Sequence, residues 1–302
     1  MSRRTNRRSE HVSTTDTRRT QAQVRAAADA GSAATSARSL LLTVLGEFVY
    51  PREGRAWTGA LVEALGTLGV ETKSARQALA RMGAEGLVEA ERHGRKVEWS
   101  LTEAGSRLIA EGTERIYTFL RNPHGWDGRW LVLNVAIPES QRRLRHQLRT
   151  RLTWLGMGSP APGLWIVPDA SKSGPARDVL DELGLADRAF AWVGTADEQT
   201  DPARLLSAAW DLSDVAQRYE RFIDDFARRT PDSGREAFAT QVELIQAWRG
   251  FPFLDPEIPL ELLPSGWPGE RAAATFHECR ERWHAAAQSE WERLAAAAAA
   301  SR

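Results

Sequence analysis

Between residues 37 and 120, the apolar positions predict a group of helices that is interrupted by one β-hairpin. Helical spacing of apolar side chains occurs in three segments before the hairpin: residues 37–50, 57–68 and 72–85. Apolar and polar positions alternate in residues 87–91 and 97–101, which is typical of paired strands. Thr58 and Thr102 are candidate N-caps of the second helix and of a further helix after the hairpin. The predicted order is helix, helix, helix, hairpin, helix.

The third predicted helix has one buried stripe and an opposite polar face. Apolar side chains recur at i, i+3, i+4 and i+7 from Ala75 to Met82, so Gln77 and several cations project from the other side. The turn over 92–96 then places three cations and a histidine around Gly94. On their own, these segments could be an ordinary solvated helix and a charged hairpin. Because the basic hairpin directly follows the polar-faced helix, we favour a DNA-binding unit in which the helix reads bases and the hairpin contacts phosphates. The candidate DNA-contacting residues are Thr72, Lys73, Ser74, Arg76, Gln77, Arg81, Arg92, His93, Arg95 and Lys96.

Residues 121–198 alternate between strand and helix patterns. Strands are predicted over 130–137, around Met157, over 164–167 and over 188–193, and helices over 139–155 and 175–183. The resulting β-α-β-β-α-β order is that of a ferredoxin-like domain. We expect this domain to act as a scaffold and dimer surface.

From Asp201 onward the pattern is helical. Helices are predicted over 202–210, 212–228, 235–248 and 269–294. The proline-rich segment between the last two is predicted to be extended, because proline fixes its own backbone and restricts the preceding residue. Its apolar residues are expected to hold it against the helices: Phe251, Phe253, Leu254, Ile258 and Leu260. The alanine-rich end, Ala295 to Ala300, continues the last helix and is assigned no chemistry.

Several segments recur together in one known family. They include ARSLLLTVLGEFVYP from Ala37, ARQALARMGAEGLVEAERHGRK from Ala75, WDGRW from Trp126, WLGMG from Trp154 and DPEIPLELLP from Asp255. No single segment is specific, but in this order the chain resembles the PaaX family of bacterial transcriptional repressors from about Ala37 to the last helix. The resemblance implies an α+β protein with an N-terminal winged helix-turn-helix, a central ferredoxin-like domain and an all-helical C-terminal domain. It also implies a homodimer that an aromatic acyl-CoA, such as phenylacetyl-CoA, releases from operator DNA.

On this basis we expect a winged helix-turn-helix domain at 37–120, a ferredoxin-like domain at 121–198 and a helical domain at 199–302. One alternative is a regulator of the same architecture that answers to a different acyl-CoA or aromatic acid. A second is a metal-dependent nuclease built on the ferredoxin-like domain. A nuclease needs a carboxylate at the end of the first strand to hold Mg²⁺, but that strand carries Asn134, and the next acid, Glu139, follows Pro138. The operator, the target genes, the effector pocket and any activating role stay open.

Composition is consistent with a cytoplasmic regulator. The formal net charge is zero, but residues 1–36 hold seven arginines against three acids, whereas 201–302 hold twelve basic and seventeen acidic residues. Residues 1–36 lack apolar periodicity and are predicted to be a disordered basic arm, either lying along phosphates or merely solvated. Cys279 is the single cysteine, so no internal disulfide is expected. No apolar run approaches the roughly 20 residues of a membrane span.

The remaining clusters give little support for enzyme chemistry. The sequence has no P-loop, nucleophile elbow or dinucleotide fingerprint. His277 and His284 share a helical face that Cys279 does not, so a metal site there is disfavoured. The arginines of the helix over 139–155 either bind phosphates or form a solvated face. We therefore expect no catalytic activity, no cofactor and no metal ion.

Overall fold

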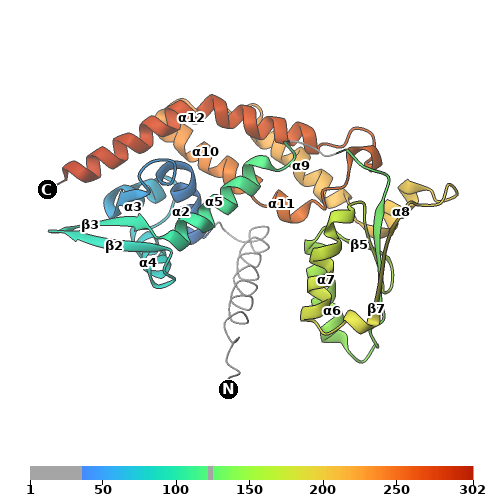
Figure 1. The fold of residues 1–302 in the computed structure, drawn as a ribbon. Coiled ribbons are helices and arrows are strands. Elements are labelled where there is room, and N and C mark those ends of the chain that lie inside the picture. Colours follow the sequence, from blue (N-terminus) through green and yellow to red (C-terminus); the bar gives the residue numbers. More distant parts are fainter. Residues whose placement is uncertain (1–35, 122–124, 302) are drawn as a thin grey trace, which may run out of the picture. The chain divides into compact units, whose positions relative to one another are not determined.

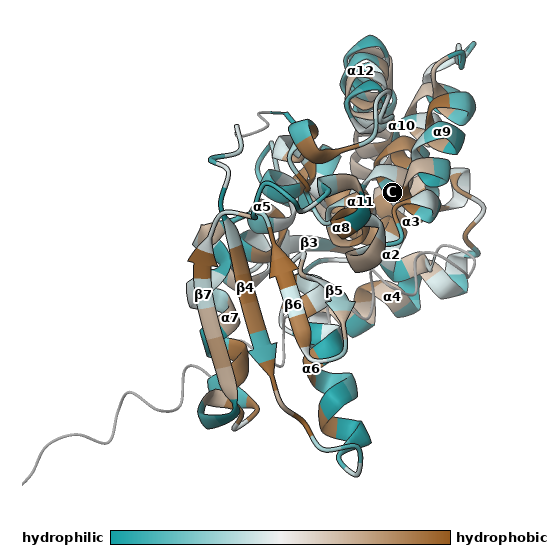
Figure 2. Cartoon of the chain, turned by 90° about the vertical axis from the view of Figure 1, so that its right-hand side faces the viewer, coloured by the Kyte–Doolittle hydropathy of each residue, from teal (hydrophilic) through white to brown (hydrophobic). Residues whose placement is uncertain are grey.

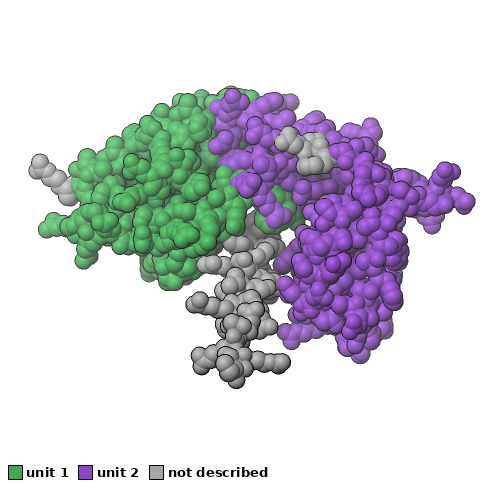
Figure 3. All heavy atoms as spheres, viewed as in Figure 1, with its two compact units in different colours: residues 1–113, 231–253, 282–302 green, residues 114–230, 254–281 purple. Residues whose placement is uncertain are grey.

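The structure is a computed structural model that describes residues 36–121 and 125–301, and its described strands form two antiparallel sheets (Figure 1). The chain divides into two compact units (Figure 3). Unit 1 comprises residues 1–113, 231–253 and 282–302, and unit 2 comprises 114–230 and 254–281. The predicted basic arm lies outside the described residues, except for its last residue.

Unit 1 contains a three-stranded sheet in the order β1-β3-β2. Its strands are β1 (Arg55–Trp57), β2 (Val88–His93) and β3 (Lys96–Leu101). Its helical segments are α2 (Ala37–Val44), the π-helix η2 (Leu45–Val49), α3 (Thr58–Thr67), α4 (Thr72–Ala84) and α10 (Gly234–Trp248). The helices α5 (Glu103–Thr118) and α12 (Gly269–Ala300) contribute residues to both units.

The start of α3 corrects one prediction. Trp57, not Thr58, is the N-cap residue, and no side chain caps this helix. The Thr58 hydroxyl instead turns toward β3, where it donates to the carbonyl of Val97 at 3.0 Å and accepts from the indole N–H of Trp99 at 2.9 Å. The reason is that β1, which the sequence analysis missed, runs directly into the helix and pairs with β3. The predicted cap at Thr102 is confirmed, because its hydroxyl accepts from the N–H of Gly105 at 3.0 Å.

The core of unit 1 combines residues from distant parts of the chain. Leu41, Phe48, Leu65 and Met82 from the N-terminal helices are each fully buried. The C-terminal helices add Ala237, Phe238 and Val242 from α10 and Ala287, Trp291 and Leu294 from α12. The ring centroids of Phe48 and Phe238 lie 4.7 Å apart. Helices from the last quarter of the chain therefore complete the core around the first three helices.

Unit 2 contains a four-stranded antiparallel sheet in the order β5-β6-β4-β7. Its strands are β4 (Trp130–Val135), β5 (Gly158–Ala161), β6 (Leu164–Val167) and β7 (Ala189–Gly194). The helices α6 (Arg142–Trp154) and α7 (Ser173–Glu182) lie on one side of the sheet (Figures 1 and 2). Their buried residues, such as Leu152 and Leu180, pack against Leu131 and Leu133 of β4. The predicted β-α-β-β-α-β order is confirmed, although α6 begins at Arg142 rather than Glu139, after the turn that follows Pro138.

The opposite side of this sheet is partly covered by α8 (Pro202–Ala209) and by the proline-rich segment. Leu206, Ile258 and Leu262 pack there against Trp130 and Ile166. The remaining elements are α9 (Ser213–Phe226), α11 (Phe251–Leu254) and the 3-10 helices η3 (Ala170–Lys172), η4 (Ala186–Arg188) and η5 (Leu260–Leu262).

The proline-rich segment is held by a buried hydrogen bond. The Tyr219 hydroxyl donates to Asp255 at 2.7 Å, and burial raises the pKa of both groups. The prediction of a wholly extended segment was wrong, because α11 and η5 lie within it. Leu254 and Leu260 are also exposed rather than packed inward, since these short helical turns direct them outward.

Candidate nucleic-acid interface

The helix α4 is fixed on unit 1 by its apolar stripe. Ala75, Ala78, Leu79 and Met82 are buried, as predicted. Close to its C-terminal end, Gly83 lies against the ring of Trp99 on β3, where an added Cβ would be 3.2 Å from the ring. Arg38 of α2 pairs with Glu85 at 2.6 Å, and Gly86 ends the helix with a φ of +71°. The helix is thus held along its length and presents one defined face to solvent.

That face carries most of the residues predicted to read DNA. Ser74 is half-buried, and the others are exposed: Thr72, Lys73, Arg76, Gln77 and Arg81. Within the described part of the chain, Lys73, Arg76 and Arg81 form no ion pair. These cations are therefore available to an external anion.

The hairpin β2-β3 ends in a tight turn of two residues. His93 and Lys96 are paired across the strands, which leaves Gly94 and Arg95 as the turn. Gly94 has a φ of +64°, a conformation that glycine adopts without steric cost. Arg92 and Arg95 are exposed, and no described residue forms an ion pair with either. The strands are therefore longer than predicted, and the exposed cations concentrate at the tip.

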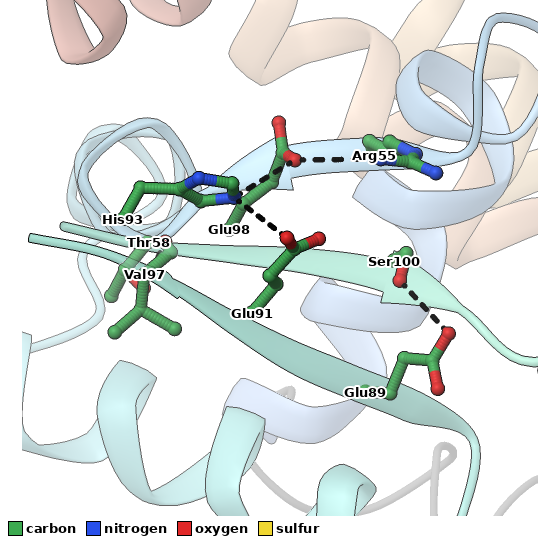
Figure 4. A network of polar contacts seen from close by, with 8 residues as sticks. All are labelled: Arg55, Thr58, Glu89, Glu91, His93, Val97, Glu98 and Ser100. Carbon is green, nitrogen blue, oxygen red and sulfur yellow. Dashed lines mark hydrogen bonds and ion pairs between the residues drawn. The ribbon is translucent and has the colours of Figure 1, made fainter.

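The hairpin side chains alternate between two faces. Trp99 and Leu101 pack toward the helices together with Val88. The other face, which we call the outer face, consists of Arg55, Trp57, Glu89, Glu91, His93, Lys96, Glu98 and Ser100. Figure 4 shows these residues except Trp57 and Lys96. Its charges include three carboxylates, so this face is not a uniform cationic surface.

Two of the predicted DNA-contacting residues have partners on the outer face. The Lys96 ammonium lies 5.6 Å from the ring centroid of Trp57 and donates to the main-chain carbonyl of Ala299 at the end of α12. The His93 imidazole lies beside Glu91 and Glu98. Sequence reasoning missed these partners, including the contact with the alanine-rich tail, because only the folded register brings these positions together.

The other residues considered from the sequence as metal or catalytic candidates do not come together into a site. Cys279 is buried, and its thiol lies 3.5 Å from the main-chain carbonyl of Phe226. His284 lies 3.8 Å from Glu47. Asn134 sits within β4, opposite Leu164 and Phe190. In the described ranges, the single group of histidine, cysteine and acidic residues with metal-binding spacing is Glu91, His93 and Glu98.

Comparisons with known proteins agree over most of the chain, from residue 36 to residue 293. Family models match residues 36–105 ("PaaX-like protein"), 123–206 ("PaaX protein central Cas2-like domain") and 210–293 ("PaaX-like protein C-terminal domain"). The chain is 30% identical over 249 residues to the transcriptional repressor PaaX of Escherichia coli (strain K12), covering 78% of this chain and 77% of that protein.

A solved structure supports the fold. The uncharacterized protein Rv0674 from Mycobacterium tuberculosis superposes with a TM-score of 0.62 at 24% identity, covering 86% of this chain and 100% of that one. Over residues 36–121 and 125–301, no helix has the length and apolarity to cross a membrane.

Proposed function

The chain belongs to the PaaX family, and from this premise we propose that it is a DNA-binding transcriptional repressor rather than an enzyme. We place a winged helix-turn-helix domain at residues 37–120, a ferredoxin-like domain at 121–198 and an all-helical domain at 199–302. The observation that carries the proposal is the exposed face of α4, whose cations pair with no described residue, followed by a hairpin with Arg92 and Arg95 at its tip.

The helix and the hairpin take different roles in this proposal. Arg76 and Gln77 lie on the exposed face of α4, where side chains of these types form hydrogen bonds with base edges in a major groove. Arg95 lies in the turn and contacts the phosphate backbone, which carries no sequence information.

This division is tested by comparing cognate and random DNA. Arg76→Ala and Gln77→Ala should each weaken binding at the cognate site by about 1 to 3 kcal/mol and relax base preference. Arg95→Ala should weaken binding to all sequences and lower the salt slope by about one. Arg107→Ala, an exposed arginine on α5, is the control. Equal losses on specific and random DNA for Arg76→Ala would contradict the assignment.

We propose that the repressor is a homodimer that binds an inverted repeat. One recognition helix reads too few base pairs for genomic specificity, and a two-fold dimer doubles the site. Phe190 and Trp192 on the edge strand β7 support this, because they are 72% and 51% exposed and lie on the side of the sheet that faces away from α6 and α7. Exposed aromatic pairs of this kind mark interaction surfaces.

We further propose that an aromatic acyl-CoA such as phenylacetyl-CoA releases the repressor from DNA. Release requires tighter binding of the ligand to the DNA-incompetent conformation. Titration of phenylacetyl-CoA, phenylacetate and CoA against the complex with operator DNA tests it, and only the thioester should lower the bound fraction. If none of the three acts at up to millimolar concentration, phenylacetyl-CoA is not the effector and the regulator answers to something else.

A cavity in unit 2 is of suitable size for the acyl part of such a ligand. It measures about 240 Å³ and lies between β4, β7 and α7. Leu131, Leu133 and Leu180 form its apolar wall, and Arg177 is an exposed cation among its lining residues. Arg177→Ala should therefore weaken release by the thioester without changing DNA affinity in its absence.

A further inference from the structure

The register of the hairpin places two carboxylates directly opposite each other. Glu91 of β2 and Glu98 of β3 are Cα partners on the outer face. Like charges in this arrangement destabilise a strand pair. Arg55 offsets this only partly, since its guanidinium lies 3.8 Å from Glu98. The pair therefore favours a further cation between its two oxygens.

An imidazole already lies beside both carboxylates. His93 Nε2 is 3.6 Å from Glu91 Oε1 and 3.8 Å from Glu98 Oε2 (Figure 4). The three ligand atoms lie within 4.8 Å of one another. The His93 ring also packs against Trp57 in a T-shaped arrangement, with ring centroids 5.4 Å apart. One nitrogen and two oxygens thus converge on one point of the outer face.

We propose that Glu91, His93 and Glu98 bind a divalent transition-metal ion of the Zn²⁺ class. In a tetrahedral zinc site with bonds of roughly 2.0 to 2.2 Å, neighbouring ligand atoms are about 3.3 Å apart, so small side-chain movements close this triad around the ion. An imidazole ligand favours Zn²⁺ over Mg²⁺ or Ca²⁺, which prefer oxygen. Three protein ligands leave one position for water. Sequence reasoning missed the site because the ligands converge only across the strand pair.

The bound ion would also change the charge of the hairpin. Two negative side chains beside the exposed Arg92 and Arg95 would be neutralised by the +2 charge, and the two strands would be joined near their tip. The hairpin would then repel DNA phosphates less. The metal site rests on the hairpin geometry alone, whereas its effect on DNA rests on the proposed function.

Metal binding is tested on the full chain after treatment with a chelator, by titration of Zn²⁺ against a competing chromophoric chelator at pH 8. One equivalent should bind, and Glu91→Gln or His93→Gln should each weaken it by more than about tenfold. Glu89→Gln is the matched control, because Glu89 lies on the same face and strand outside the triad. Mg²⁺ should not compete. The proposal is overturned if Zn²⁺ does not bind at micromolar concentration, or if both triad variants bind it as the unaltered protein does.

The effect on DNA is a separate measurement. Zn²⁺ should tighten binding of the unaltered protein and of Glu89→Gln to duplex DNA, but not of His93→Gln. Zinc binding without any change in DNA affinity would overturn the proposed effect on DNA binding but not the metal site itself. Absence of DNA binding with and without zinc would contradict the proposed function, not the metal site.

Discussion

The two sheets of this protein each pack one face against helices, but their outer faces differ in kind. The outer face of the three-stranded sheet carries Arg55, His93, Lys96 and three glutamates. The corresponding face of the four-stranded sheet carries Phe190 and Trp192 at its edge strand, and both are exposed. A face that combines carboxylates with an imidazole suits a metal ion, whereas an exposed aromatic face suits another protein surface. The difference supports the proposed metal site on one sheet and the proposed self-association on the other, while the proposed DNA contact lies on α4 and at the hairpin tip.

The largest effect is expected when the aromatic face of β7 is changed into a charged one. Combined Phe190→Asp and Trp192→Asp should dissociate the proposed dimer, because each buried aromatic anchor of an interface contributes about 2 kcal/mol or more. Sedimentation velocity at micromolar concentration measures this. Trp154→Ser, which alters an exposed tryptophan on α6, is the control. A double variant that stays dimeric with unaltered affinity would place the interface elsewhere.

The charged sheet is attached to its helices by a close approach at Gly105. Gly105 of α5 approaches the residue before β2 so closely that an added Cβ would lie 1.9 Å from the carbonyl oxygen of Leu87. Gly105→Ala should therefore destabilise unit 1 by about 3 kcal/mol, since backbone must shift. Gly112→Ala, in the same helix with open space around it, should instead stabilise by about 0.5 to 1 kcal/mol. Urea unfolding of both variants tests this, and equal effects would contradict the close approach.

Local sequence patterns were sufficient to predict most elements, but not their long-range partners. The stripe from Ala75 to Met82 predicted both the helix and its exposed face, because helical periodicity depends only on near neighbours. The short strand β1 escaped prediction, since three residues carry too little pattern and depend on pairing with β3. No local signal indicated that Trp291 completes the core around Phe48. The partners of His93 and Lys96 were hidden for the same reason.

A smaller effect on the free energy of unfolding is expected at the contact between α3 and the charged sheet. Thr58→Val removes both hydrogen bonds of its hydroxyl and leaves the Trp99 indole N–H without that acceptor. The free energy of unfolding of unit 1 should fall by about 1 to 2 kcal/mol. Thr67→Val in the same helix is the control, because its hydroxyl bonds only to the carbonyl of Glu63 in its own helix. Similar losses for both variants in urea unfolding would show that the contact with β3 contributes nothing.

The smallest effect, a change in the salt dependence of DNA binding, should come from removing the end of α12. Its carbonyl at Ala299 accepts from Lys96, at the helix end where the macrodipole attracts cations, so this ammonium is withheld from a phosphate. Deletion of residues 296–302 should release Lys96 and steepen the salt dependence of binding to random DNA by about one phosphate contact. Deletion of Arg302 alone is the control for the lost charge. In the Lys96→Gln background the longer deletion should change nothing, because the released cation is absent. If the longer deletion still steepens the salt dependence in the Lys96→Gln background, the tail acts through something other than Lys96. If it leaves the slope unchanged in the otherwise unaltered protein, Lys96 reaches DNA without leaving the helix end.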